Sequence, residues 1–262
     1  MNTMHNDVHA AHANEAQAGA SHPSPLIPLP VEGRGNPSGR WWTVVVFAIA
    51  MAWVESAVVF YIRTMVDRIE PHQPEPLPLI GTLGPVELAR ELATLIMHFT
   101  IGMLAGRTWR ARIGYMAVSF GIWDVFYYVY LKIMCDWPKT LLDWDILFLL
   151  PLPWWGPVLS PMLIALLMIV WGTLASQFER LQLPAISEWR VWGLNSLGIA
   201  LALYVFMADA IRVADQGVEV IRNVLPARFN WPLFCIALVL MAAPVVKLCR
   251  RAIERSKLVD VE

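Results

Sequence analysis

The chain has 262 residues, of which 57% are hydrophobic and 16% charged, and its formal net charge is −1. Ordinary soluble domains carry about 25% charged residues, so this composition, with a mean hydropathy of +0.52, excludes a typical soluble domain and predicts an all-α polytopic membrane protein. The sequence has no glycine-rich phosphate loop and no basic face suited to nucleic acid, so we expect the lipid bilayer as a partner and no nucleic acid.

The first 40 residues differ from the rest because they are polar and rich in alanine, histidine, proline and glycine. They hold no early apolar run and no arginine-rich amphipathic pattern, which argues against a cleaved signal peptide and against a transit peptide. A segment of this composition cannot bury enough apolar surface to fold. We therefore expect a disordered cytoplasmic tail at 1–40, a membrane domain at 41–250 and a second cytoplasmic tail at 251–262.

Six apolar segments are long enough to cross a membrane as helices. Each has about 18–22 residues, which suits a hydrocarbon core about 30 Å thick. Proline in the first helical turn marks the start of two of them, at Pro85 and at Pro161, and we expect Ser160 to be the N-cap of the fourth. The predicted transmembrane helices are 41–62, 86–106, 113–134, 161–178, 191–209 and 231–248.

The distribution of positive charge predicts the orientation of these spans. The connector 107–112 holds three arginines and no acid, and five lysines and arginines lie between residues 247 and 257. Four spans separate these two segments, so both lie on one side, which the positive-inside rule makes cytoplasmic. We therefore expect a bacterial-type inner (plasma) membrane protein with both termini in the cytoplasm and the connector 135–157 outside.

Residues 146–157 are apolar but contain Pro151, Pro153, Gly156 and Pro157, which leave too few continuous residues for a span. Irregular backbone at membrane depth persists only where protein buries it or water reaches it. We therefore expect a re-entrant or interfacial segment before the fourth span. The alternative is a kinked N-terminal extension of that span.

Glu55, Glu91 and Asp124 interrupt three successive apolar spans. An ionisable group near the bilayer centre costs about 2.5–3.5 kcal/mol on insertion scales and usually has a function. At about 1.5 Å per residue, Glu55 and Glu91 would lie about 10 Å below the outer face, Asp124 about 15 Å and His98 about 20 Å. The acidic groups are therefore expected to form a ladder that descends from the outer face.

Helical spacing predicts which polar groups can meet. On the second span Glu87, Glu91, Thr94 and His98 are separated by steps of four, three and four, which place them on one narrow stripe. The candidate residues for a proton, cation or ligand site are Glu55, Glu91, His98, Asp124, Tyr127 and Tyr128. The candidate residues for the mouth of the cavity are Glu87, Arg90, Asp143, Asp145 and Asp209.

These residue types leave several kinds of site open. Glu87 and Arg90 could form an interfacial ion pair with no further role, and the other groups could simply hold helices together. One metal ion can hardly bind both Glu91 and His98, which lie about 10 Å apart along the helix, and a single span histidine does not support a bis-histidine haem. We therefore predict no metal and name no cofactor. A proton or cation path and a pocket for an amphipathic ligand both suit the pattern.

The leading hypothesis is that the acidic cavity opens to the outer face and binds or relays a proton, a cation or a small polar or lipid headgroup. A second hypothesis is a non-catalytic subunit or assembly factor of a larger membrane complex, because the chain is small and lacks a complete catalytic motif. A third is an intramembrane enzyme that uses carboxyl groups for acid–base work on a lipid-like substrate. We also consider a disulfide between Cys135 and Cys235, which are both predicted near the outer face.

Overall fold

The computed structural model describes residues 37–73, 83–177 and 188–259, so nearly all of the predicted tail 1–40 lies outside the described residues. The described part belongs to one unit, 36–262, and is mostly helical. In chain order its elements are α2 (Pro37–Met65), α3 (Leu83–Ala105), α4 (Trp109–Cys135), β1 (Trp144–Phe148), β2 (Trp154–Pro157), α5 (Leu159–Ser176), α7 (Trp189–Arg212), η1 (Ala214–Gln216), α8 (Val218–Asn223), α9 (Trp231–Met241) and α10 (Ala243–Val259).

Five of the described helices are long and apolar enough to cross a membrane: α2, α3, α4, α5 and the helix that starts at Trp189. A sixth span is present if α9 and α10 count as one, although the pair bends by 40° at its break. The break precedes Pro244, which has no N–H to donate to the preceding turn and whose ring disfavours a straight helix. Asn195 of α7 donates to the Met241 carbonyl, which lies at the break, at 3.1 Å.

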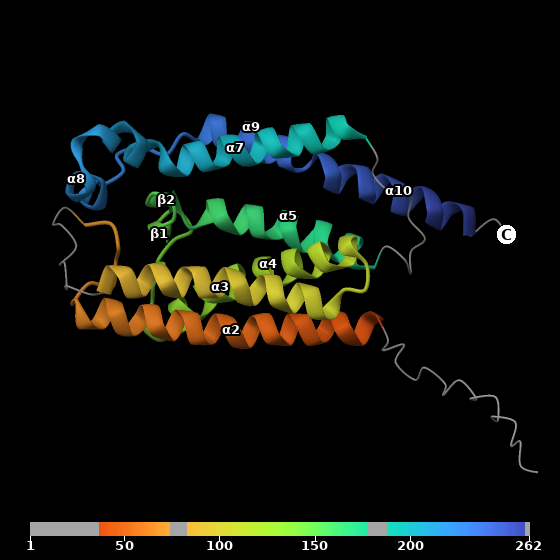
Figure 1. The fold of residues 1–262 in the computed structure, drawn as a ribbon, viewed down its shortest axis with the longest axis horizontal. Helices are drawn as coiled ribbons and strands as arrows, with labels where there is room; N and C mark the ends of the chain where they lie inside the picture. Colours follow the sequence, from red (N-terminus) through yellow and green to blue (C-terminus); the bar gives the residue numbers. More distant parts are fainter. Residues whose placement is uncertain (1–36, 74–82, 178–187, 260–262) are drawn as a thin grey trace, which may run out of the picture. The chain divides into compact units, whose positions relative to one another are not determined.

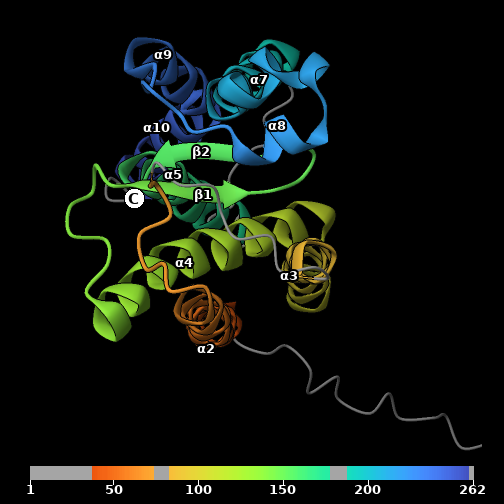
Figure 2. The same cartoon turned by 90° about the vertical axis from the view of Figure 1, so that its left-hand side faces the viewer.

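Helix α4 is the centre of the first part of the structure, because α2, α3 and α5 all pack against it. Helix α9 packs against α7. The hairpin β1–β2 and α5 lie between this pair and the helices α2, α3 and α4 (Figure 1). Viewed from the end, the hairpin lies between α4 and α7 (Figure 2). Strand β2 contacts α7, and Phe148 of β1 stacks on Phe120 of α4.

Small residues let α4 and α5 approach closely. A Cβ added to Gly172 of α5 would lie 2.5 Å from the Gly114 carbonyl oxygen of α4, and one added to Gly121 would lie 2.6 Å from the Ala165 carbonyl. The same type of packing joins α2 to α4, where the fully buried Ala48 and Ala52 belong to one cluster with Trp123. Small residues at helix contacts are typical of membrane proteins, in which close packing drives association.

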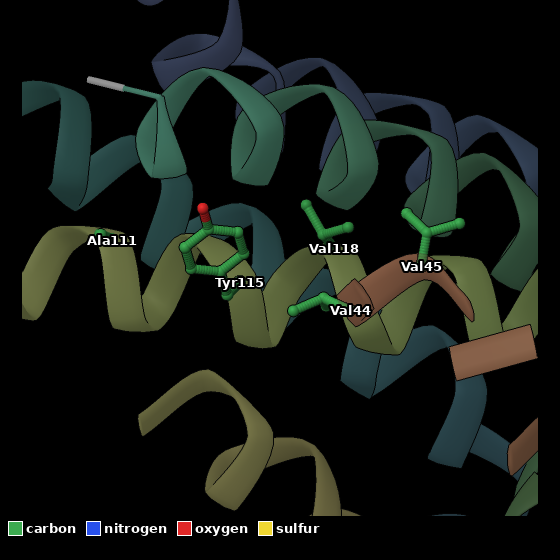
Figure 3. Close-up of a cluster of buried hydrophobic side chains, with 5 residues drawn as sticks. All are labelled: Val44, Val45, Ala111, Tyr115 and Val118. Carbon is green, nitrogen blue, oxygen red and sulfur yellow. The ribbon is translucent and has the colours of Figure 1, made fainter. Parts of the chain in front are cut away.

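The end of the bundle away from the hairpin is closed by apolar packing. Val44 and Val45 of α2 meet Ala111, Tyr115 and Val118 of α4 in a buried cluster (Figure 3). Arg40 donates to the Ala105 carbonyl at the end of α3 at 3.0 Å, which satisfies a carbonyl that has no partner within its own helix.

The segment for which we expected a re-entrant or interfacial form contains an antiparallel hairpin. Asp145 pairs with Gly156 and Ile146 with Trp155, and the register shifts between Ile146 and Phe148. The expectation for Ser160 was wrong: α5 begins at Leu159 with Val158 as N-cap, and the Ser160 hydroxyl donates to the Pro157 carbonyl at 2.6 Å. The hairpin brings the chain to α5 two residues earlier than the proline pattern indicated.

Candidate functional site

A cavity of about 770 Å³ lies where α2, α3, α4, the hairpin and α7 meet. This volume falls within the range of about 300–1,000 Å³ that is typical of small-molecule sites. Apolar side chains form much of its wall, including Leu88, Phe148, Leu149, Ile164 and Phe206. The ionisable residues on its wall are Glu55, Arg63, Arg68, Glu87, Arg90, Glu91, Asp124, Tyr127, Tyr128 and Asp145.

Arg90 joins two of the carboxyl groups. Its guanidinium pairs with Glu87 through two hydrogen bonds, of 2.9 Å from Nε and 2.5 Å from Nη2, and it also pairs with Glu55 of the neighbouring helix α2. Glu55 accepts a further hydrogen bond from the Thr94 hydroxyl at 2.5 Å. The predicted Glu87–Arg90 pair therefore extends into a network that ties α3 to α2, and Glu55 is neutralised within it.

A second ion pair fixes the hairpin to α2. The Arg63 Nη2 donates to Asp145 Oδ1 at 2.8 Å, and the two side chains are 10% and 1% exposed. The Arg63 guanidinium also lies 4.1 Å from the centre of the Trp137 ring and donates to the Ile69 carbonyl. Burial raises the pKa of Asp145, while the charge of Arg63 and the Ile146 N–H act in the opposite direction.

Glu91 fixes the other end of the hairpin to α3. Both of its carboxylate oxygens accept from the Leu149 backbone N–H at 3.0 Å. Leu149 directly follows β1, where the chain leaves the ladder and its N–H would otherwise be buried without a partner. Glu91 thus has a structural role that helical spacing did not reveal, because the partner is a backbone group of a distant segment.

Asp124 differs from the other four cavity carboxyl groups. It is 9% exposed and lines the cavity from the middle of α4. Within the described ranges, no hydrogen bond or ion pair joins its carboxyl to another group of the protein. An unpaired buried carboxylate is costly in a low-dielectric environment. Asp124 is therefore the wall carboxyl group that can bind a ligand without first breaking a protein contact.

The two tyrosines of the predicted site lie one turn beyond Asp124 and also line the cavity. The Tyr127 ring lies 6.0 Å from the Trp123 ring, centre to centre, and 5.1 Å from the Tyr128 ring. Tyr128 is 4% exposed. The structure therefore brings Asp124, Tyr127 and Tyr128 to the wall of one cavity.

His98 lies apart from this wall. It is 1% exposed, its Nδ1 lies 2.9 Å from the Ser119 hydroxyl, and its ring packs against Phe120 and Trp123. Its Nε2 has no hydrogen-bond partner in the described chain, and His98 is not among the residues that line the cavity. The two aromatic rings that contact His98 do line the cavity.

Two of the residues predicted for the cavity mouth lie elsewhere. Asp209 pairs with Arg212 one turn on, at 2.8 Å, and does not line the cavity. Asp143 accepts from the Lys139 and Thr140 amides, at 2.7 and 3.2 Å, and from the Thr140 hydroxyl at 2.7 Å. Partial burial acts to raise the pKa of Asp143, but these hydrogen bonds lower it overall. Asp143 thus holds the turn that leads into β1.

The sequence did not identify the aromatic part of the wall. Trp123 lines the cavity next to Asp124. Phe148 and Trp154 of the hairpin, with ring centres 5.2 Å apart, face the same space, and Trp154 stacks on Phe206 of α7. The signal available in the sequence was Asp145, a single charged residue between Trp144 and Ile146, which indicates that this apolar segment reaches an internal polar site.

The described residues contain no group of three histidine, cysteine, aspartate or glutamate side chains placed to hold a metal ion. All three cysteines are free, so the disulfide between Cys135 and Cys235 does not form in this structure. No protein-family model, no curated protein and no solved structure matches the chain.

Proposed function

We propose that this membrane protein binds an amphipathic ligand in the cavity, with Asp124 as the group that holds the polar head. The observation that carries the proposal is the contrast among five carboxyl groups. Glu55, Glu87, Glu91 and Asp145 are each bound by an arginine or a backbone N–H. Asp124 is also buried, at 9% exposed, but it has no such partner among the described residues and is left for a ligand.

The proposal includes a topology of six spans, in which α9 and α10 together form the last and the hairpin is an interfacial element. The hairpin and η1–α8 lie at one end of the bundle, and the connector with Arg107, Arg110 and Arg112 lies at the other (Figure 1). The positive-inside rule makes the arginine-rich end cytoplasmic. Both termini are then cytoplasmic in an inner membrane, and the cavity opens to the outer face.

The inner limit of the cavity favours ligand binding over a relay of protons or cations across the membrane. A relay needs polar groups in sequence, but His98 does not line the cavity and packs against the rings of Phe120 and Trp123, which do. A ligand would then enter and leave at the same end. The largely apolar wall suits the hydrocarbon part of a lipid-like molecule, and Asp124 supplies the specific polar contact.

The ligand should be identified directly. The wild type would be purified in lipid nanodiscs, and bound small molecules would be extracted and analysed by mass spectrometry. Asp124→Asn should reduce ligand occupancy by about tenfold or more, because a hydrogen bond to a charged group contributes about 1.5–3 kcal/mol. Asp136→Asn is the matched control, since Asp136 lies at the exposed end of the same helix in a left-handed conformation that asparagine tolerates.

A second pair of variants tests the cavity rather than the charge. Val59 lines the cavity from α2, so Val59→Trp should displace the ligand. Val54 on the same helix is 61% exposed, and Val54→Trp should have no effect. A ligand that persists in both Asp124→Asn and Val59→Trp would contradict the proposal. A wild type that carries a stoichiometric protein partner and no small molecule would instead support the subunit hypothesis.

A further inference from the structure

We propose that the head group held by Asp124 is an organic cation, a primary amine or a quaternary ammonium, an inference that rests on the ligand-binding function proposed above. The charges on the wall support it first. Five carboxyl groups and three guanidinium groups line the cavity, so the fully ionised wall has an excess of two negative charges. A cationic head group would neutralise the carboxylate of Asp124, which no described residue neutralises.

Two of the three arginines on the wall argue against an anionic head group such as a phosphate. Arg90 already binds Glu55 and Glu87, and Arg63 binds Asp145 and lies over the Trp137 ring. At either of these two arginines an anion would have to displace a buried pair, and it would lie in the field of the remaining carboxylates. Removing one partner from a buried ion pair is strongly unfavourable.

Aromatic faces beside Asp124 supply the second contact that an ammonium group needs. Trp123 and Tyr127 lie on the same wall with ring centres 6.0 Å apart, and Phe148 and Trp154 of the hairpin line the same space. Cations are attracted to the faces of such rings, and aromatic cages with a carboxylate recognise quaternary ammonium groups. No three side chains typical of metal ligands converge within 37–73, 83–177 and 188–259, so the arrangement suits an organic cation better than a metal ion.

The test compares amphiphiles that differ in the head group alone. Tetradecyltrimethylammonium, tetradecylamine, tetradecanol and tetradecanoate would each be added to the full-length wild type in nanodiscs of neutral lipid, and binding would be measured by calorimetry and by the shift in Tm. The two cations should bind at least about tenfold more tightly than tetradecanol, and tetradecanoate should bind more weakly still. Asp124→Asn should lose this preference, and Asp136→Asn should retain it.

The outcomes separate this inference from the function on which it rests. Equal or tighter binding of tetradecanol or tetradecanoate would overturn the cationic head group and leave the amphipathic ligand in place. If no compound binds in a way that Val59→Trp abolishes, both proposals are wrong. The ranking in the wild type needs no variant, so the test holds even if Asp124→Asn fails to fold.

Discussion

Replacing Asp145 with asparagine should destabilise the protein strongly, because the substitution leaves the Arg63 guanidinium buried without a counter-ion. The pair has an N–O distance of 2.8 Å and side-chain exposures of 10% and 1%. Breaking a buried ion pair by removing one partner typically costs about 3–5 kcal/mol. Arg63 would keep its hydrogen bond to the Ile69 carbonyl and its contact with the Trp137 ring. We therefore expect a cost near the lower limit, about 3 kcal/mol.

The surface pair between Lys132 and Asp136 is the matched control. Its N–O distance of 2.7 Å is nearly the same, but its side chains are 47% and 84% exposed. Exposed pairs contribute little because water screens both charges. Asp136→Asn should therefore leave the stability almost unchanged. The two variants differ mainly in burial and not in the length of the contact.

The free energies of unfolding would be measured by titration with a denaturing detergent from mixed micelles, with the circular dichroism signal as readout. The double variant Arg63→Met, Asp145→Asn should be more stable than Asp145→Asn alone, because it removes the unpaired cation. Equal stability of Asp145→Asn and Asp136→Asn would refute the reasoning. So would a double variant whose loss equals the sum of its two single losses, because the two residues would then not interact.

Three further predictions address the helix contacts, the hairpin and the turn before it. Gly172→Ala should destabilise the protein by about 1–3 kcal/mol, because the new Cβ would lie 2.5 Å from a carbonyl oxygen of α4. Gly193 has open space around it, so Gly193→Ala should not destabilise the protein, and chemical denaturation of the two variants would show the difference. Glu91→Leu should speed hydrogen exchange at the Leu149 amide by about tenfold or more, and unchanged exchange would show that this carboxylate does not anchor the hairpin. The pKa of Asp143 is lowered in the folded state, so its stabilising effect should be present above its ordinary pKa of 3.8 and be lost as the pH falls through the lower folded value. The Tm difference from Asp143→Asn, followed against pH, should accordingly disappear at low pH, and a constant difference would contradict it.

The sequence alone indicated the membrane class and much of the polar stripe. Apolar segments of sufficient length predict helices because a lipid environment requires each backbone N–H and C=O to be satisfied within the segment. The steps of four, three and four placed Glu87, Glu91, Thr94 and His98 on one face of α3, and the structure has the first three on the cavity wall. Helical phase depends only on local geometry, so it can be read from the sequence.

The partners of these groups could not be read in the same way. Asp143 and Asp145 are two residues apart and of the same type, yet one holds an exposed turn and the other is buried against Arg63. Similarly, Glu91 binds a backbone N–H of the hairpin, whereas Asp124 has no described partner. Spacing along one element contains no information about which distant segment will lie opposite.

The sequence therefore predicted which side chains share a helix face. Tertiary structure decided which carboxyl groups are neutralised, and thereby which one has no partner among the described residues. The reason is that helical phase arises from contacts within about one turn, whereas neutralisation requires a second segment to bring a cation or an N–H within about 3 Å. The backbone N–H of Leu149, at the end of β1, binds Glu91, and Arg63 of α2 binds Asp145 of the hairpin. Asp124 lines the cavity without such a partner among the described residues.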